Sequence, residues 1–86
     1  MTYSLRIRRS AAKALAKVTK PDRLRLIEAI DRLRNEPHAG GVLKGEFSGL
    51  RRLRVGDYRV VYEVIDEELV VRVIRVGHRS AVYRAS

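Results

Sequence analysis

The spacing of apolar residues changes midway along the chain, and this change constrains the fold more than any other feature of the sequence. Between residues 21 and 36, leucines and isoleucines recur every three or four residues, which predicts a helix with one apolar stripe. After residue 51 the period becomes two, with Leu53 and Val55 alternating with Arg52 and Arg54, and two runs rich in valine follow after short turns, which predicts β-strands. Helical segments followed by several strands indicate helices packed on a sheet.

The first half of the chain is expected to hold one strand and two helices. Residues 3–7 alternate as a short strand does. Ser10 is a candidate cap for an alanine-rich helix that stops near residues 19–20, because Pro21 disfavours helical geometry in the residue before it. Pro21 suits the first turn of a second helix, which ends before Pro37. The short link makes these helices an antiparallel hairpin.

Three strands are expected after a glycine-rich connection at residues 38–49. The last of them, residues 69–76, is apolar on both faces apart from Arg72 and Arg75, so we expect it inside the sheet, with Gly77 ending it. The predicted fold class is α+β, a two-layer sandwich in which a two-helix hairpin packs on a mostly antiparallel four-stranded sheet (β-α-α-β-β-β). We expect residues 1–86 to form a single domain.

The charge of the chain predicts a polyanionic partner. Nineteen Lys+Arg against ten Asp+Glu give a net charge of +9, and fifteen of the nineteen are arginine, which suits bidentate phosphate contacts. There is no cysteine, and the two histidines have no metal-ligand spacing, so we expect no metal and no cofactor. No apolar run reaches the roughly 20 residues of a membrane span, and we see no signal peptide. The absence of cysteine is typical of a cytoplasmic protein, which is what we expect.

Basic residues gather on two of the predicted strands. Arg52 and Arg54 are two apart and project from one face of the sheet, and Arg59 follows across the Gly56-Asp57 turn. If Arg79, after the last strand, lies beside them, four guanidinium groups converge, with Tyr83 close behind. Like charges side by side cost stability unless an anion neutralises them, which favours a phosphate-binding face over a merely solvated one.

Three segments form a recognisable pattern, namely Leu43-Lys44-Gly45, residues 53–64 with the sequence LRVGDYRVVYEV, and residues 76–79 with Tyr83-Arg84. In these segments the chain resembles the RelE/ParE toxin superfamily, and the resemblance covers essentially the whole chain. The resemblance implies a toxin of a type II toxin–antitoxin system. Members of the RelE branch cleave messenger RNA in the ribosomal A site, whereas members of the ParE branch inhibit DNA gyrase and lack the catalytic residues.

The resemblance to the RelE branch also implies roles for individual residues. Arg59, Arg79 and Tyr83 match the arginines and the tyrosine of the nucleases, while Arg52 and Arg54 stand where well-known members have lysines. We therefore expect a metal-independent endoribonuclease that uses the 2′-hydroxyl of RNA as nucleophile and so inhibits translation. Tyr83 is the candidate general base, Arg59 and Arg79 stabilise charge, and His78 is a tentative general acid. The expected phosphate contacts are Arg52, Arg54, Lys44 and Arg51.

The same resemblance implies the partners. They are a cognate antitoxin, messenger RNA on the ribosome with contacts to 16S rRNA, and operator DNA only through the antitoxin complex; no membrane is involved. Two other functions stay open at this point. One is gyrase inhibition without nuclease activity on the same fold, and the other is a basic nucleic-acid-binding module without activity.

Overall fold

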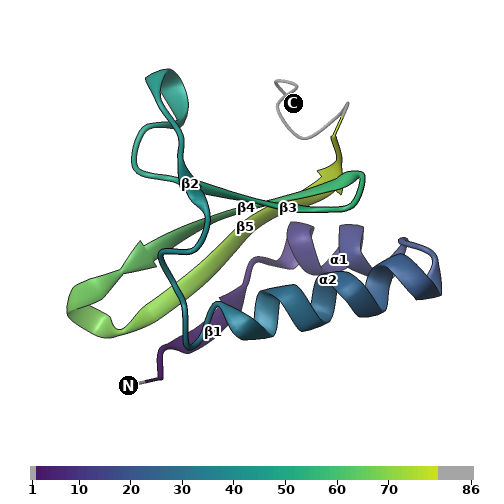
Figure 1. The fold of residues 1–86 in the computed structure, drawn as a ribbon, viewed down its shortest axis with the longest axis horizontal. Helices are drawn as coiled ribbons and strands as arrows, with labels where there is room; N and C mark the ends of the chain where they lie inside the picture. Colours follow the sequence, from purple (N-terminus) through teal and green to yellow (C-terminus); the bar gives the residue numbers. More distant parts are fainter. Residues whose placement is uncertain (1, 80–86) are drawn as a thin grey trace.

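The computed structural model describes residues 2–79 as two helices packed on one face of a five-stranded sheet (Figure 1). The strand order is β1-β5-β4-β3-β2, and every neighbouring pair is antiparallel except β1 and β5. The elements are β1 (Ser4–Ile7), α1 (Arg9–Ala16), α2 (Lys20–Arg32), β2 (Gly41–Val42), the 3-10 turn η1 (Gly45–Phe47), β3 (Arg51–Val55), β4 (Tyr58–Ile65), the 3-10 turn η2 (Asp66–Glu68) and β5 (Val70–His78).

The predicted α+β sandwich is confirmed, and β5 lies inside the sheet between β1 and β4, as expected. The sheet has one strand more than predicted, because β2, inside the glycine-rich connection, pairs with β3 over two residues. Two residues are too few to show an alternating pattern in the sequence. β5 also continues past Gly77 to His78, since Gly77 pairs with Arg59 of β4.

The predicted cap of the first helix is wrong. The N-cap is Arg8, without a side-chain cap hydrogen bond, and Ser10 lies in the first turn of α1. The reason is that Arg8 still donates its backbone N–H to the Val73 carbonyl at 2.9 Å, so the chain leaves the sheet and enters the helix without a linker. The helix is also shorter than expected and ends at Ala16.

The core lies between the helices and one face of the sheet. Leu26, Ile30 and Leu33 at α2 and its C-cap are fully or almost fully buried. They belong to one apolar cluster with residues of α1, β4 and β5, namely Ala11, Leu15, Val60, Tyr62, Val71, Val73 and Val76. Because Val60 and Tyr62 face the helices, the residues that alternate with them on β4 face the other way.

Tyr62 holds the chain segment that leads into β2 in place by hydrogen bonds. Its hydroxyl donates to the Pro37 carbonyl at 2.8 Å and accepts the Gly40 N–H at 2.9 Å, and both bonds are buried. Burial raises the pKa of Tyr62, so the phenol keeps the proton that it donates. A Cβ at Gly40 would lie 2.7 Å from both the Arg52 carbonyl oxygen and the Tyr62 hydroxyl, so the close approach requires glycine.

We expect Tyr62→Phe to lower the free energy of unfolding by about 1–3 kcal/mol, because the buried Gly40 N–H and Pro37 carbonyl lose their partner. Urea denaturation followed by circular dichroism measures this. The matched control is Tyr3→Phe, which removes an exposed bond from Tyr3 to Asp66. We expect a smaller loss there, since water can replace the bond. Equal losses in the two variants would contradict the role of Tyr62.

A second test uses neighbouring glycines. Gly40→Ala should destabilise the protein by about 1–3 kcal/mol, because the added methyl group meets backbone and a buried ring. Gly41→Ala adds the same group where no atom lies within 4 Å, and we expect a change of no more than about 0.5 kcal/mol. Thermal and urea unfolding of both variants measure the change in the free energy of unfolding. A Gly40→Ala protein as stable as the wild type would refute the close approach.

Candidate nucleic-acid interface

The face of the sheet that points away from the helices is strongly basic. Directly paired residues of neighbouring strands point to the same side, so Arg54 and its partner Arg59 share a face, as do Arg52 and its partner Val61. Leu53 and Val55, which alternate with these arginines, pack against the core instead. We call this side the arginine face. It carries Arg6, Arg52, Arg54, Arg59, Arg72 and Arg75, with Glu63 as the acidic residue at the described strand positions.

A β-bulge brings two further arginines to this face. Val61 pairs with Arg75, but the next residue, Tyr62, pairs with Val73, so Ile74 is skipped. Glu63 then pairs with Arg72. Since Val61 and Glu63 lie on the same side of β4, Arg75 and Arg72 also share a side, although a regular strand would put residues three apart on opposite sides. The sequence shows that two arginines interrupt an apolar strand. It does not show that they lie on the same side of the sheet, because this depends on the bulge.

Positive charge on the arginine face is only partly balanced. Arg72 forms an ion pair with Glu63 at 3.0 Å. Arg54 and Arg59 are opposite each other on paired strands, an arrangement in which like charges repel. Arg52 and Arg54 are both exposed. A bound anion would therefore be favoured at the end of the sheet where β3 turns into β4.

Arg79 is held at that same end of the sheet. Its backbone N–H donates to the carbonyl of Asp57, in the turn between β3 and β4, at 2.8 Å. This turn is tight because Gly56 adopts a φ of +59° directly after β3. The residue after β5 thus lies next to the turn that joins Arg54 to Arg59. Tyr83, the predicted general base, lies outside the described residues.

The structure does not bring His78 or Arg51 onto the arginine face. His78 pairs with Tyr58, and the two rings meet edge to face with centroids 5.8 Å apart, on the side where Tyr58 packs against the core. Arg51 alternates with Arg52 and points the other way; its guanidinium donates to the carbonyls of Gly40 at 2.8 Å and His38 at 3.3 Å. This arrangement gives Arg51 a structural role beside Tyr62.

Lys44 lies apart from the other predicted phosphate contacts. It is exposed and directly precedes η1, which projects from the sheet on the side away from the helices (Figure 1). The backbone N–H of Leu43 donates to the Leu50 carbonyl at 2.9 Å and closes the base of this projection. Lys44 therefore flanks the arginine face from the β2 edge.

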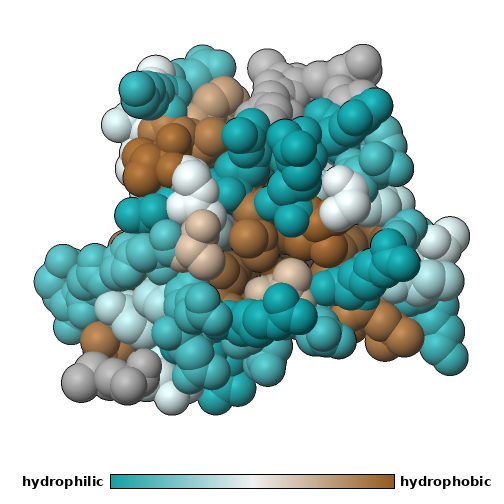
Figure 2. Space-filling model, viewed as in Figure 1, coloured by the Kyte–Doolittle hydropathy of each residue, from teal (hydrophilic) through white to brown (hydrophobic). Residues whose placement is uncertain are grey.

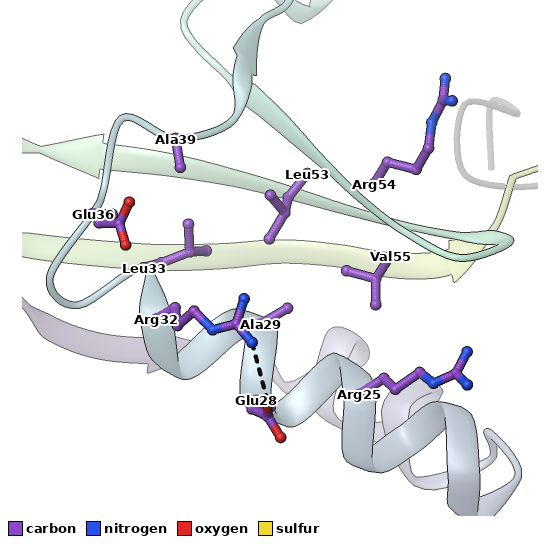
Figure 3. A pocket seen from close by; sticks show the side chains of 10 residues that line it. All are labelled: Arg25, Glu28, Ala29, Arg32, Leu33, Glu36, Ala39, Leu53, Arg54 and Val55. Atoms are coloured by element: carbon purple, nitrogen blue, oxygen red, sulfur yellow. Dashed lines mark hydrogen bonds and ion pairs between the residues drawn. The ribbon is translucent and has the colours of Figure 1, made fainter.

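An apolar groove adjoins the arginine face between α2 and β3. It has a volume of about 360 Å³ and an apolar wall formed by Ala29, Leu33, Leu53 and Val55. Figure 2 shows this apolar surface in the middle of the molecule, below a row of hydrophilic side chains. In Figure 3 the side chain of Arg54 points away from the groove, while Leu53 and Val55 point into it. The β3 strand thus presents a charged side and an apolar side.

Among residues 2–79, no group of three or more His, Asp or Glu side chains is placed to hold a metal ion. No helix in this part of the chain is long and apolar enough to cross a membrane.

Comparison with known proteins identifies the family. The model of ParE toxins of type II toxin–antitoxin systems matches residues 5–83. A Mycobacterium tuberculosis protein named Toxin RelE is 36% identical, over 95% of this chain and 87% of the relative. The crystal structure of the RelBE2 toxin–antitoxin complex of M. tuberculosis superposes with a TM-score of 0.84 at 32% identity, covering 92% of this chain and 100% of that one. The archaeal RelE–RelB complex from Pyrococcus horikoshii gives 0.77 at 34% identity, over 95% and 100%.

The family match extends over nearly the whole described chain, and the fold of the relatives is the fold found here. Several relatives exceed 30% identity over more than two thirds of both chains. The chain therefore belongs to the RelE/ParE superfamily and is a toxin of a type II toxin–antitoxin system.

Proposed function

We propose that this toxin is a ribosome-dependent endoribonuclease that cleaves messenger RNA in the A site and so inhibits translation. The observation that carries the proposal is the gathering of Arg52, Arg54 and Arg59 on one face of the sheet, with Arg79 anchored beside the turn that joins them. Relatives named RelE support the nuclease branch. Guanidinium groups suit phosphate because their planar donors match its oxygens.

The proposed reaction is an internal transesterification that uses only groups of the RNA and the protein. The 2′-oxygen attacks the adjacent phosphorus and gives its proton to a general base, while the 5′-oxygen leaves and takes up a proton. The products are a 2′,3′-cyclic phosphate and a 5′-hydroxyl. Arg59 and Arg79 would stabilise the negative charge that builds up on the phosphate, and Arg52 and Arg54 would hold the backbone. Tyr83, which the resemblance matches to the tyrosine of the nucleases, is the candidate for the base.

His78 is the candidate general acid. It is exposed at the end of β5, directly before Arg79. Its ring packs against Tyr58 on the other side of the strand from Arg59. Such a modest set of acid and base groups favours a mechanism in which the ribosome aligns the message, because correct alignment can contribute more than proton transfer. Free RNA would then be a poor substrate.

A cognate antitoxin is the proposed protein partner. Two of the similar structures are toxin–antitoxin complexes. The net charge of +9 favours an acidic partner, and the groove between α2 and β3 offers it apolar contact. Arg32 at the rim of the groove is paired with Glu28, and Glu36 also lines the groove, so Arg25 and Arg54 are the rim cations that an acidic segment would meet. An amphipathic segment with acidic residues fits both features. Operator DNA would be bound through the antitoxin.

We expect Arg79→Ala to slow cleavage of a ribosome-bound message by about 10²–10³-fold, because it removes a charge that stabilises the transition state. Lys13→Ala is the matched control, since Lys13 is an exposed cation on α1 in the helix layer, and its rate should not change. Primer extension on a defined message in a purified translation system measures both rates, and circular dichroism checks that both variants fold. Equal rates in the two variants would refute the assignment of Arg79.

Gyrase inhibition is the second candidate, because the matching family model is that of the ParE toxins. It predicts gyrase-dependent DNA breaks in a purified gyrase assay while a message on the ribosome stays intact. The nuclease proposal predicts the reverse pattern, with unchanged gyrase activity. The two assays on one protein preparation separate the candidates.

A further inference from the structure

A second group of arginines lies at the β1 edge of the arginine face. Arg6 and Arg72 are directly paired on the parallel strands β1 and β5. Arg8 continues the β1 ladder, because its backbone N–H donates to the Val73 carbonyl at 2.9 Å. These three arginines line a hollow of about 450 Å³, together with Ile7 and Ile74. Residues of the proposed nuclease site do not line this hollow.

The charges in this group are poorly balanced. Arg72 is paired with Glu63, but Arg6 and Arg8 have no carboxylate partner among residues 2–79. Arg8 also stands at the N-cap of α1, followed by Arg9 and by no acidic residue in the first turn. Positive charge at this end of a helix opposes the helix dipole. Both features would be relieved by an anion held between Arg6 and Arg8.

The hollow lies on the same side of the sheet as Arg54 and Arg59. Arg8 adjoins Val73, whereas Arg59 pairs with Gly77 further along β5. The two places are therefore separated by roughly 10–13 Å along the strands, which is three residues of β4 or four of β5, and by roughly 10 Å across two strand spacings. The arginines of β5 lie between them on one continuous face. A single nucleic-acid strand a few nucleotides long can span this distance.

We propose that Arg6, Arg8 and Arg72 form a second phosphate-binding site for single-stranded RNA, which holds the backbone a few nucleotides away from the phosphate at Arg54 and Arg59. The ligand class rests on the proposed function, whereas the site itself rests on the hollow and its unbalanced charge. RNA is favoured over an acidic protein because the hollow continues the arginine face. The apolar groove that suits a protein segment lies elsewhere, between α2 and β3.

The test is the salt dependence of RNA binding. The probe is a fluorescein-labelled 2′-O-methyl RNA dodecamer, which the protein cannot cleave because the attacking hydroxyl is blocked. Fluorescence anisotropy gives its dissociation constant over a range of salt concentrations. Loss of two phosphate contacts in the double variant Arg6→Gln/Arg8→Gln should lower the slope of log affinity against log salt by about 1.4, and binding should weaken. Arg6→Lys/Arg8→Lys keeps both charges and should restore the slope.

Lys13→Gln/Lys17→Gln is the matched control, because it removes two exposed charges from the helix layer and should leave the slope unchanged. A slope for Arg6→Gln/Arg8→Gln equal to that of this control would overturn the second site. Arg52→Gln/Arg54→Gln tests the first site separately. If Arg52→Gln/Arg54→Gln alone loses RNA binding, the phosphate contacts of the proposed nuclease site stand and the second site is refuted. If Arg6→Gln/Arg8→Gln alone loses RNA binding, the second site stands and the phosphate contacts of Arg52 and Arg54 are refuted. Denaturation midpoints confirm that all variants fold.

Discussion

The helices cover only one face of the sheet, and this constraint determines on which face the charged side chains of the strands lie. Every side chain of β3, β4 and β5 must either join the apolar core beneath α1 and α2 or face away from it. Most of the apolar side chains, with Tyr62, occupy the first side. Five strand arginines are left on the second side, beside the buried Val61, namely Arg52, Arg54, Arg59, Arg72 and Arg75. The arginine face is therefore a direct consequence of core burial.

Three further structural features place individual side chains on this face. At the β2 edge, the buried hydroxyl of Tyr62 and the guanidinium of Arg51 both bind the segment around Gly40, which fixes β2 against β3. On β5, the bulge at Ile74 keeps Arg72 and Arg75 on one side while Val73 and Val76 stay in the core. At the turn end, the bond from Arg79 to Asp57 holds the chain after β5 next to Arg59. Packing and charge placement thus depend on the same few contacts.

Much of this could be predicted from the sequence, because periodicity reports burial. The change from helical to alternating spacing predicted the layers, and the two-residue spacing of Arg52 and Arg54 predicted their common face. The rest depends on contacts that a linear pattern does not contain. β2 is too short to show an alternating pattern. The bulge in β5 interrupts the alternation of side chains between the two faces of the sheet. The role of Arg51 depends on backbone carbonyls that Tyr62 holds close to it. The second arginine group needed the parallel pairing of β1 with β5, which joins opposite ends of the chain.

The most direct test of the account is to map cuts in a defined message by primer extension, with the wild-type protein added to a purified translation system and to the same message without ribosomes. A ribosome-dependent nuclease would cut at codons in the ribosomal A site, leave a 2′,3′-cyclic phosphate at each cut, and produce almost no cuts on free RNA. A message that stays intact on translating ribosomes would contradict the account, and the arginine face would then have to be explained by another polyanion.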